Sequence, residues 1–189
     1  RDNEYSYVYQ TSWGVSSRMI GALIMVHSDD DGLVLPPKIA PTQVVIIPIG
    51  DDIEVKELCN KYEEELKKNN ISSKVDNTEK SPGFKFAEAE VLGIPVRIEI
   101  GKRDLENNQV TLVRRDTKEK ITISKDSDIV CEVNSLMEKI QNNLLERATI
   151  RRDQMTYEAK TKEEFTSIMN NTPGFVKADW CGDVACEEK

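Results

Sequence analysis

Residues 43–66 read QVVIIPIGDDIEVKELCNKYEEEL and form the first unit of the folding pattern. The apolar run over residues 44–49 has the length of a buried strand. Either Asp51 or Asp52 can cap the helix that follows, because a carboxylate accepts hydrogen bonds from the free amides of a helix start. The apolar side chains of this helix recur at helical spacing: Val55, Leu58, Cys59, Tyr62 and Leu66. This strand–helix unit predicts an α/β domain.

Strands and helices continue to alternate downstream. The sequence predicts strands over residues 71–75, 94–100, 110–114 and 120–123, and a helix over residues 82–92 that Gly93 ends. Within the strand 94–100, apolar residues alternate with Pro95, Arg97 and Glu99. That alternation predicts a half-buried strand, with one face in the core and the other in solvent.

A long helix is expected to follow the last strand. Ser127 or Asp128 can cap it, and its apolar stripe runs as far as Ala148. Polar residues of helical character continue toward Asn170, and the stretch 171–174 (NTPG) stops them. The complete order of elements predicts a mixed sheet with helices packed on it.

The residues before this domain follow another pattern. Residues 4–11 predict a strand, and residues 16–26 predict a helix with almost no polar face. Such a helix needs burial on nearly all sides, and nothing nearby in the chain supplies the cover. A catalytic body outside this sequence is therefore its expected partner. Three prolines within residues 33–42 predict an extended connector, with a domain boundary near Gln43.

Composition excludes several classes of protein. The 189 residues are 38% apolar and 32% charged, which is typical of a globular protein, and no apolar run reaches the length of a membrane span. A net charge of −8 argues against a non-specific nucleic-acid binder but not against RNA recognition by a few placed side chains. The four scattered cysteines do not resemble a disulfide framework, so we expect a reducing, cytoplasmic setting. Both ends of the chain are expected to be cuts through a longer protein.

Residues 12–18 (SWGVSSR) place a glycine-containing turn before a helix whose first turn carries Arg18. Helix amino termini attract anions, Gly14 permits close backbone approach, and a guanidinium pairs with phosphate or stacks on a base. These features suit a nucleotide. A surface arginine on a core helix is the alternative that the residues alone leave open.

Residues 11–23 (TSWGVSSRMIGAL) and 25–41 (MVHSDDDGLVLPPKIAP) closely resemble the third signature motif of prolyl-tRNA synthetases, which are class II enzymes. The resemblance implies that Arg18, as the catalytic residue, and Ser16 bind ATP, which acts with Mg²⁺. It places Ser12, Trp13 and Gly14 in the proline pocket. The implied reaction attaches L-proline to tRNA(Pro) through prolyl-adenylate, in a homodimer. Because the other signature motifs are absent here, this chain alone is expected to be inactive.

Residues 81–90 (SPGFKFAEAE) and 95–104 (PVRIEIGKRD) resemble the anticodon-binding domain of the same family. The resemblance implies a mixed five-stranded sheet with flanking helices, and it implies that Phe86, Glu90 and Arg103 approach the anticodon. An aromatic ring, a carboxylate and a guanidinium are groups that read unstacked bases. Three alternatives remain: Phe86 as a core residue, Glu90 on a solvated helix face, and Arg103 as an ion-pair partner of Asp104.

Cys181 and Cys186 are separated by four residues, as in half of a tetrahedral zinc site. Spacing alone favours free thiols, because no second pair follows, and Cys59 and Cys131 fall in predicted core elements. The resemblance to the archaeal and eukaryotic type of the family instead implies a structural zinc ion, with its other cysteine pair downstream. His27, the one histidine, is expected to cap a helix or lie on the surface.

Three segments are therefore expected. Residues 1–42 are the end of a class II catalytic domain, with its last strand and helix followed by a linker. Residues 43–147 are the anticodon-binding domain, and residues 148–189 begin a zinc-binding α/β tail. Two other functions remain possible: a stand-alone tRNA-binding or regulatory module, and a threonyl-type synthetase. The intact motif at residues 12–18 argues against the first, and the Ser-Trp-Gly turn with the cysteine tail argues against the second.

Overall fold

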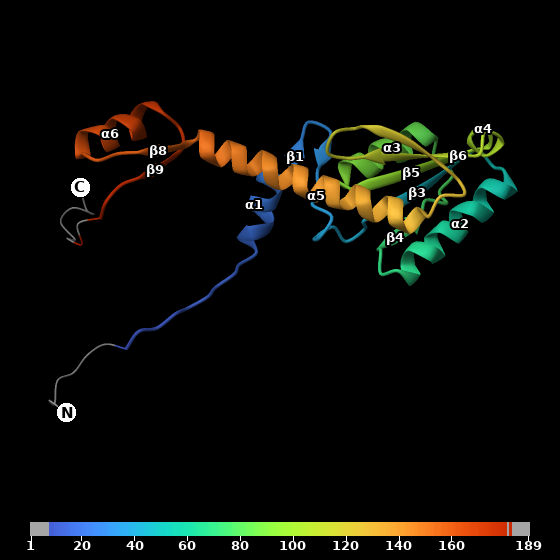
Figure 1. Ribbon diagram of the computed structural model, residues 1–189, viewed down its shortest axis with the longest axis horizontal. Coiled ribbons are helices and arrows are strands. Elements are labelled where there is room, and N and C mark those ends of the chain that lie inside the picture. The colour runs from blue at the N-terminus through green and yellow to red at the C-terminus, as the bar shows by residue number, and fades with distance from the viewer. Residues whose placement is uncertain (1–7, 181, 183–189) are drawn as a thin grey trace.

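A mixed five-stranded sheet lies at one end of the elongated molecule (Figure 1). The computed structural model describes residues 8–180 and residue 182. The strands occur in the spatial order β4-β3-β5-β6-β7. Their bounds are Val44–Ile49 (β3), Ser73–Val75 (β4), Val96–Gly101 (β5), Gln109–Arg114 (β6) and Lys120–Ser124 (β7). β3 pairs in parallel with β4 and β5, whereas β5, β6 and β7 pair antiparallel. The predicted mixed sheet is confirmed.

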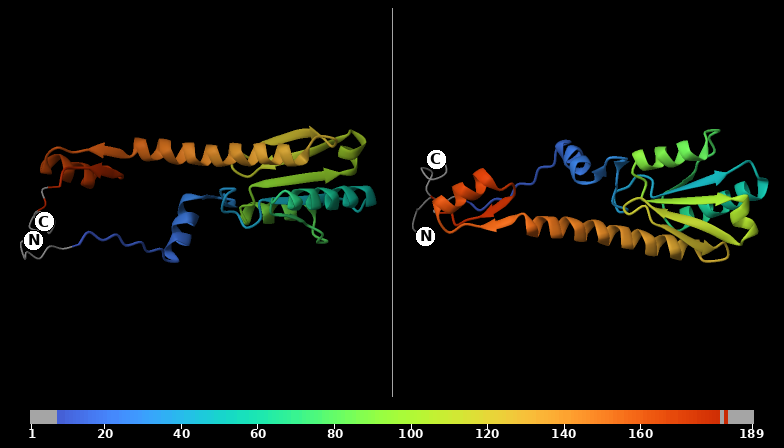
Figure 2. Two further views of the ribbon diagram at one scale, coloured as in Figure 1. Left: turned by 60° about the horizontal axis from the view of Figure 1, so that its bottom comes forward. Right: turned by 90° about the horizontal axis from the view of Figure 1, so that it is seen from above.

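Helices cover both faces of this sheet. α2 (Ile53–Lys68) and α5 (Ile129–Gln154) pack on one face, and α3 (Pro82–Val91) packs on the other (Figure 2). Successive side chains of β3 point to opposite faces, so Ile46 joins the larger core below α2 and α5, while Ile47 joins the smaller core below α3. A central strand with parallel neighbours is normally buried on both faces, as β3 is here.

The prediction of a half-buried strand over residues 94–100 is wrong. Every residue of β5 is buried, and Arg97 and Glu99 are only 8% and 6% exposed. The side that carries them lies under α3 and not in solvent. Alternation of charged and apolar residues marked the two faces correctly, but it did not reveal that the charged face is covered.

Carboxylates cap the two helices of the larger core. Asp52 accepts from the amide of Glu54 at 3.0 Å, and Asp128 accepts from the amides of Val130 and Cys131, each at 3.0 Å. The second residue of each predicted capping pair is thus the cap. A short helix that the sequence did not predict, α4 (Lys102–Glu106), follows β5 directly.

The prediction of continuous helix toward Asn170 is wrong. α5 ends at Gln154 and is followed by β8 (Thr156–Glu158) and then by a separate helix, α6 (Lys162–Asn171). Thr161 and Glu164 form a capping box that starts α6, and this signal lies within the polar stretch. β8 pairs in parallel with β9 (Phe175–Lys177). The predicted boundary at residue 147 falls inside α5.

The segment before the sheet contains one exposed helix. α1 (Arg18–Val26) leaves Met19, Ile20 and Met25 between 62% and 79% exposed, so the apolar helix has no cover within the described residues. A hairpin follows it, formed by β1 (Ser28–Asp29) and β2 (Gly32–Leu33). Residues 8–11 form no strand, so that half of the strand predicted over residues 4–11 is wrong, and residues 4–7 lie outside the described part. None of the described helices is long and apolar enough to span a membrane.

Candidate nucleic-acid interface

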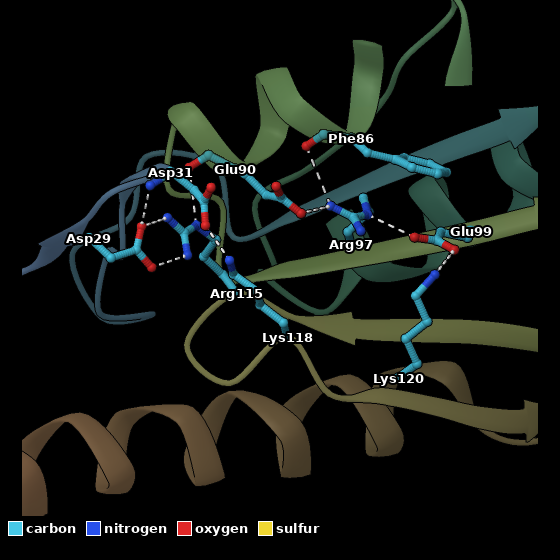
Figure 3. A network of polar contacts seen from close by, with 9 residues as sticks. All are labelled: Asp29, Asp31, Phe86, Glu90, Arg97, Glu99, Arg115, Lys118 and Lys120. Carbon is cyan, nitrogen blue, oxygen red and sulfur yellow. Dashed lines mark hydrogen bonds and ion pairs between the residues drawn. The ribbon is translucent and has the colours of Figure 1, made fainter. Parts of the chain in front are cut away.

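The end of α3 and the middle of β5 bring an aromatic ring and several charges together. Pro82 stands in the first turn of α3, where its fixed φ angle favours helix and its missing amide costs nothing. Phe86 and Glu90 are four residues apart on this helix and therefore share one side of it. That side faces Arg97 and Glu99 of β5 (Figure 3).

Arg97 is the centre of this group. Its Nε donates to Oε1 of Glu99 at 2.9 Å, and its Nη1 donates to Oε1 of Glu90 at 3.0 Å. The guanidinium carbon lies 4.5 Å from the centre of the Phe86 ring, within range for a cation–π contact. At the outer side, Lys120 Nζ donates to Oε2 of Glu99 at 3.2 Å. We call Phe86, Glu90, Arg97, Glu99 and Lys120 the Arg97 cluster.

The Arg97 cluster is electrically balanced but unevenly exposed. Two carboxylates face one guanidinium and one ammonium group, which offsets the cost of burying Arg97 and Glu99. The side chains of Glu90 and Lys120 are 29% and 59% exposed. These groups can therefore meet a ligand: carboxylates accept from the N–H groups of a base edge, and cations donate to base acceptors or phosphate.

The structure supports the core alternative for Phe86 in part, but it does not support the solvated-face alternative for Glu90. Phe86 is partly buried against the smaller core, yet its ring also lies beside the Arg97 guanidinium. Glu90 is not a solvated helix residue, because its carboxylate holds Arg97.

Arg103 lies elsewhere, on α4 beyond the end of β5, and is exposed. No hydrogen bond or ion pair between described residues links it to the Arg97 cluster. Arg103 and Asp104, both among the described residues, form no ion pair with each other, and the Asp104 carboxylate accepts from the amide of Gly101 at 2.8 Å.

The residues expected to bind ATP and proline lie around the start of α1. Ser12, Trp13, Gly14 and Ser16 belong to an irregular, exposed segment, and Trp13 is 94% exposed. Arg18 lies in the first turn of α1, as the sequence predicts, although the helix begins at Arg18 and not at residue 16; the Arg18 residue is exposed. The structure does not bring these residues into contact with the Arg97 cluster.

Comparison with known proteins places the chain in a family. Residues 43–143 match the family described as "Anticodon binding domain". The chain belongs to this family. Its anticodon-binding domain contains the whole five-stranded sheet and the Arg97 cluster.

The relatives of this anticodon-binding domain match the rest of the chain too. The proline–tRNA ligase of Clostridium novyi is 52% identical over 190 residues, covering 100% of this chain and 39% of that protein. The proline–tRNA ligase of Lachnoclostridium phytofermentans is 53% identical over the same length and coverage. A crystal structure of prolyl-tRNA synthetase from Cryptosporidium parvum, complexed with L-proline and AMP, has a TM-score of 0.82 and 40% identity, covering 90% of this chain and 37% of that one. The chain thus spans 39–40% of the length of the curated relatives it matches.

Sequence reasoning did not select three members of the Arg97 cluster. The sequence pattern places Arg97 and Glu99 on a solvent face of the anticodon-binding domain, and Lys120 at a strand end. One signal was available: two opposite charges at alternate positions of a strand between apolar strands point to a covered ion pair, because parallel sheets are covered on both faces.

The cysteines and the histidine occupy different environments. Cys59 is buried, as predicted, and burial raises the pKa of its thiol to about 12. Cys131 is exposed, so its predicted place in the core is wrong: it lies on the outer side of the first turn of α5. His27 follows the last residue of α1 as its carboxyl cap, as expected, and partial burial lowers its pKa.

The predicted zinc ligands Cys181 and Cys186 lie outside the described residues. Within residues 8–180, no cluster of histidine, cysteine and carboxylate side chains suits a metal ion.

Proposed function

We propose that this chain is the anticodon-reading and ATP-contacting portion of an enzyme that attaches L-proline to tRNA(Pro) through prolyl-adenylate. The observation that carries the proposal is the continuous match of the whole chain to proline–tRNA ligases at 52–53% identity, including both α1 and the anticodon-binding domain. We place the chain at the carboxyl-terminal part of a homodimeric, cytoplasmic enzyme. The likeness to the Cryptosporidium parvum structure, together with the sequence of residues 181–187, favours the archaeal and eukaryotic type.

The anticodon is the proposed ligand of the Arg97 cluster. The partly exposed carboxylate of Glu90 suits the N–H groups of a guanine edge, and the exposed ammonium group of Lys120 suits base acceptors or phosphate, while buried Arg97 holds Glu90 in place. Because Arg97 is already held by two carboxylates and by the Phe86 ring, it is preorganised, and little side-chain entropy is lost when a base binds. Arg103, exposed on α4, is a separate contact to the anticodon loop.

The start of α1 is the proposed ATP contact. Arg18 stands at the amino end of the helix, where free amides and the helix dipole already favour an anion. Arg18 stabilises charge on the phosphates, with Mg²⁺ bound to the nucleotide, and Ser16 assists it. Ser12, Trp13 and Gly14 line the proline pocket. The exposed apolar face of α1 packs against the remaining catalytic domain, without which the chain is inactive.

Zinc has a structural role in this proposal. Cys181 and Cys186 supply two thiolates, and the other two ligands come from polypeptide beyond this chain, which fits the four-ligand geometry of structural zinc sites. Metal analysis of the complete protein tests this point, and an absence of zinc would refute it.

Substitution at Glu90 tests the anticodon role in the complete enzyme. Glu90→Ala should raise the KM for tRNA(Pro) roughly 10-fold and leave proline-dependent pyrophosphate exchange unchanged, because loss of one good base contact costs about 1–3 kcal/mol. Glu88→Ala is the matched control, since Glu88 lies on the same helix and pairs with Lys80 instead of Arg97. Equal losses in exchange and charging would refute the proposed role of Glu90.

Substitution at Arg18 tests the ATP contact. Arg18→Ala should lower pyrophosphate exchange by roughly 100-fold or more, as loss of a placed charge donor typically does. Arg18→Lys separates charge from geometry, because lysine keeps the charge and loses the planar pair of donors. Normal exchange by Arg18→Ala would remove Arg18 from the site.

A further inference from the structure

The hairpin Ser28–Leu33, which follows α1, is held to the anticodon-binding domain by a paired set of hydrogen bonds (Figure 3). Nη1 of Arg115 donates to Oδ2 of Asp29 at 2.8 Å, and Nη2 donates to Oδ1 at 2.6 Å. The Arg115 side chain is only 3% exposed. Such a fork-to-fork pair fixes both the distance and the plane of the two groups.

The same guanidinium also contacts the helix that carries the proposed anticodon site. Nε of Arg115 donates to the backbone oxygen of Glu90 at 3.1 Å, and the carboxylate of Glu90 accepts from Arg97. One buried side chain therefore links Asp29, which lies three residues after the end of α1, to a member of the Arg97 cluster.

A second ion pair supports the first. Lys118, in the turn between β6 and β7, pairs with Asp31 of the hairpin. Lys118 has a φ angle of 61°, in the left-handed region that a side chain with a Cβ atom adopts only at some energetic cost. The turn thus holds a strained residue at the position from which it reaches the hairpin.

Two glycines bring the backbones together without room for side chains. Gly32 has a φ angle of +136°, and a Cβ atom there would lie 2.5 Å from Cα of Val91 at the end of α3. Gly93 has a φ angle of +69°, and a Cβ atom there would lie 2.7 Å from the backbone carbonyl carbon of Leu33. Because backbone meets backbone at both points, the hairpin cannot slide along α3 without breaking these contacts.

We propose that these contacts form a rigid joint that sets the direction in which α1 leaves the anticodon-binding domain, and that Asp29 and Arg115 are positioning residues for proline transfer to tRNA. The inference rests on the proposed function. α1 carries Arg18 of the ATP site, and α3 carries the anticodon site. By fixing α1 relative to α3, the joint allows one bound tRNA to reach both sites at once, one with each end. Neither Asp29 nor Arg115 touches a substrate in this arrangement.

The test uses the complete ligase carrying Asp29→Asn. The amide keeps the shape of the side chain and loses the charge and one acceptor, which loosens the joint. The kcat for charging of tRNA(Pro) should fall roughly 10- to 100-fold, because a small misplacement of the reacting groups slows the transfer step. The KM for tRNA should change by less than about twofold. Pyrophosphate exchange, which needs no tRNA, should stay normal.

Asp30→Asn is the matched control. Asp30 lies in the same turn, is exposed, and forms no hydrogen bond or ion pair with Arg115 or Lys118 among the described residues, so the kcat for charging, the KM for tRNA and pyrophosphate exchange should match those of the unaltered enzyme. Hydrogen exchange of the peptide covering residues 28–35 gives an independent reading: its amides should exchange faster in Asp29→Asn than in Asp30→Asn. Should Asp29→Asn fail to fold, Lys118→Ala replaces it, since the Lys118 side chain is 56% exposed.

The outcomes distinguish a failure of the proposed positioning role from a failure of the proposed function. Normal kcat for tRNA charging by Asp29→Asn, in an enzyme whose unaltered form is active, overturns the joint and leaves the proposed function intact. Loss of charging through KM alone also overturns it, because that result marks Asp29 as a binding contact. An unaltered complete protein without proline-dependent exchange overturns the proposed function, and the positioning role falls with it.

Discussion

A single residue, Arg97, shows how burial and recognition are combined in this domain. A guanidinium that is 8% exposed has lost most of its water, and only its contacts with Glu90, Glu99 and Phe86 compensate. Removing one partner of this buried group therefore lowers stability more than replacing the whole pair by apolar residues of similar volume would. Residues of this kind contribute to stability and to binding at once, so variants at this site need both measurements.

Glu99→Gln is expected to lower the free energy of unfolding of this chain by about 2 kcal/mol. The amide keeps the volume of the side chain, but buried Arg97 loses a charged acceptor and Lys120 loses its partner. Urea titration followed by circular dichroism measures the change. Glu106→Gln, on exposed α4, is the control and should shift stability by less than about 0.5 kcal/mol. Equal stabilities of the two variants would show that the pair contributes nothing.

Two cysteines should differ in reactivity. Burial raises the pKa of Cys59 to about 12, so at pH 8 it is almost entirely thiol, whereas Cys131 is exposed. Iodoacetamide should modify Cys131 faster by roughly 100-fold or more, as followed by mass spectrometry of the two peptides. In urea the two rates should become similar. Comparable rates in the folded chain would contradict the buried position of Cys59.

At the scale of secondary structure, local chemistry was a good guide to where helices begin. Carboxylates at Asp52 and Asp128 cap α2 and α5, and apolar spacing identified the faces that these helices bury. Local chemistry did not show that α5 ends at Gln154, because helical composition continues through the break and only the pairing of β8 with β9 interrupts it. The capping box of Thr161 and Glu164 was the available signal.

Asp128→Ala is expected to lower the free energy of unfolding by about 1 kcal/mol, the usual effect of losing an amino-terminal cap. Asp128 accepts from two amides that the first turn of α5 cannot satisfy internally. Ser127→Ala is a matched control, because Ser127 was the alternative cap and the structure assigns the role to Asp128. Chemical denaturation of both variants decides the matter: a larger loss for Ser127→Ala would place the cap one residue earlier.

At the scale of the whole molecule, the sequence predicted the helices and strands better than it predicted the contacts between residues far apart in the chain. The strand–helix order, and with it the sheet, followed from patterns a few residues long. The pair Asp29–Arg115 spans 86 residues, and no local pattern marks it. The same holds for Arg97: its charge was visible in the sequence, but its cover by α3 was not. The resemblance implied three anticodon residues, Phe86, Glu90 and Arg103. The structure joins the first two through Arg97 and leaves Arg103 apart on α4.

The joint between the hairpin and the sheet should weaken in acid. The hydrogen bonds from Arg115 lower the pKa of Asp29 from 3.8 to about 2. Because the pKa is lower in the folded state, the carboxylate stabilises the fold fully above about pH 5, and this contribution disappears as the pH falls from about 5 to 2. Its size is about 1 kcal/mol, since the Asp29 side chain is 40% exposed and solvent screens the pair.

The measurement is the difference in unfolding free energy between the unaltered chain and Asp29→Asn, taken by urea titration from pH 7 to pH 3, so that the titration of all other groups cancels. The difference should be constant above about pH 5 and shrink toward pH 3. Asp30→Asn should show no such trend, because Asp30 has no contact with Arg115. A difference for Asp29→Asn that is as large at pH 3 as at pH 7 would mean that the carboxylate charge does not hold the hairpin, and that the backbone contacts at Gly32 and Gly93 carry the joint alone.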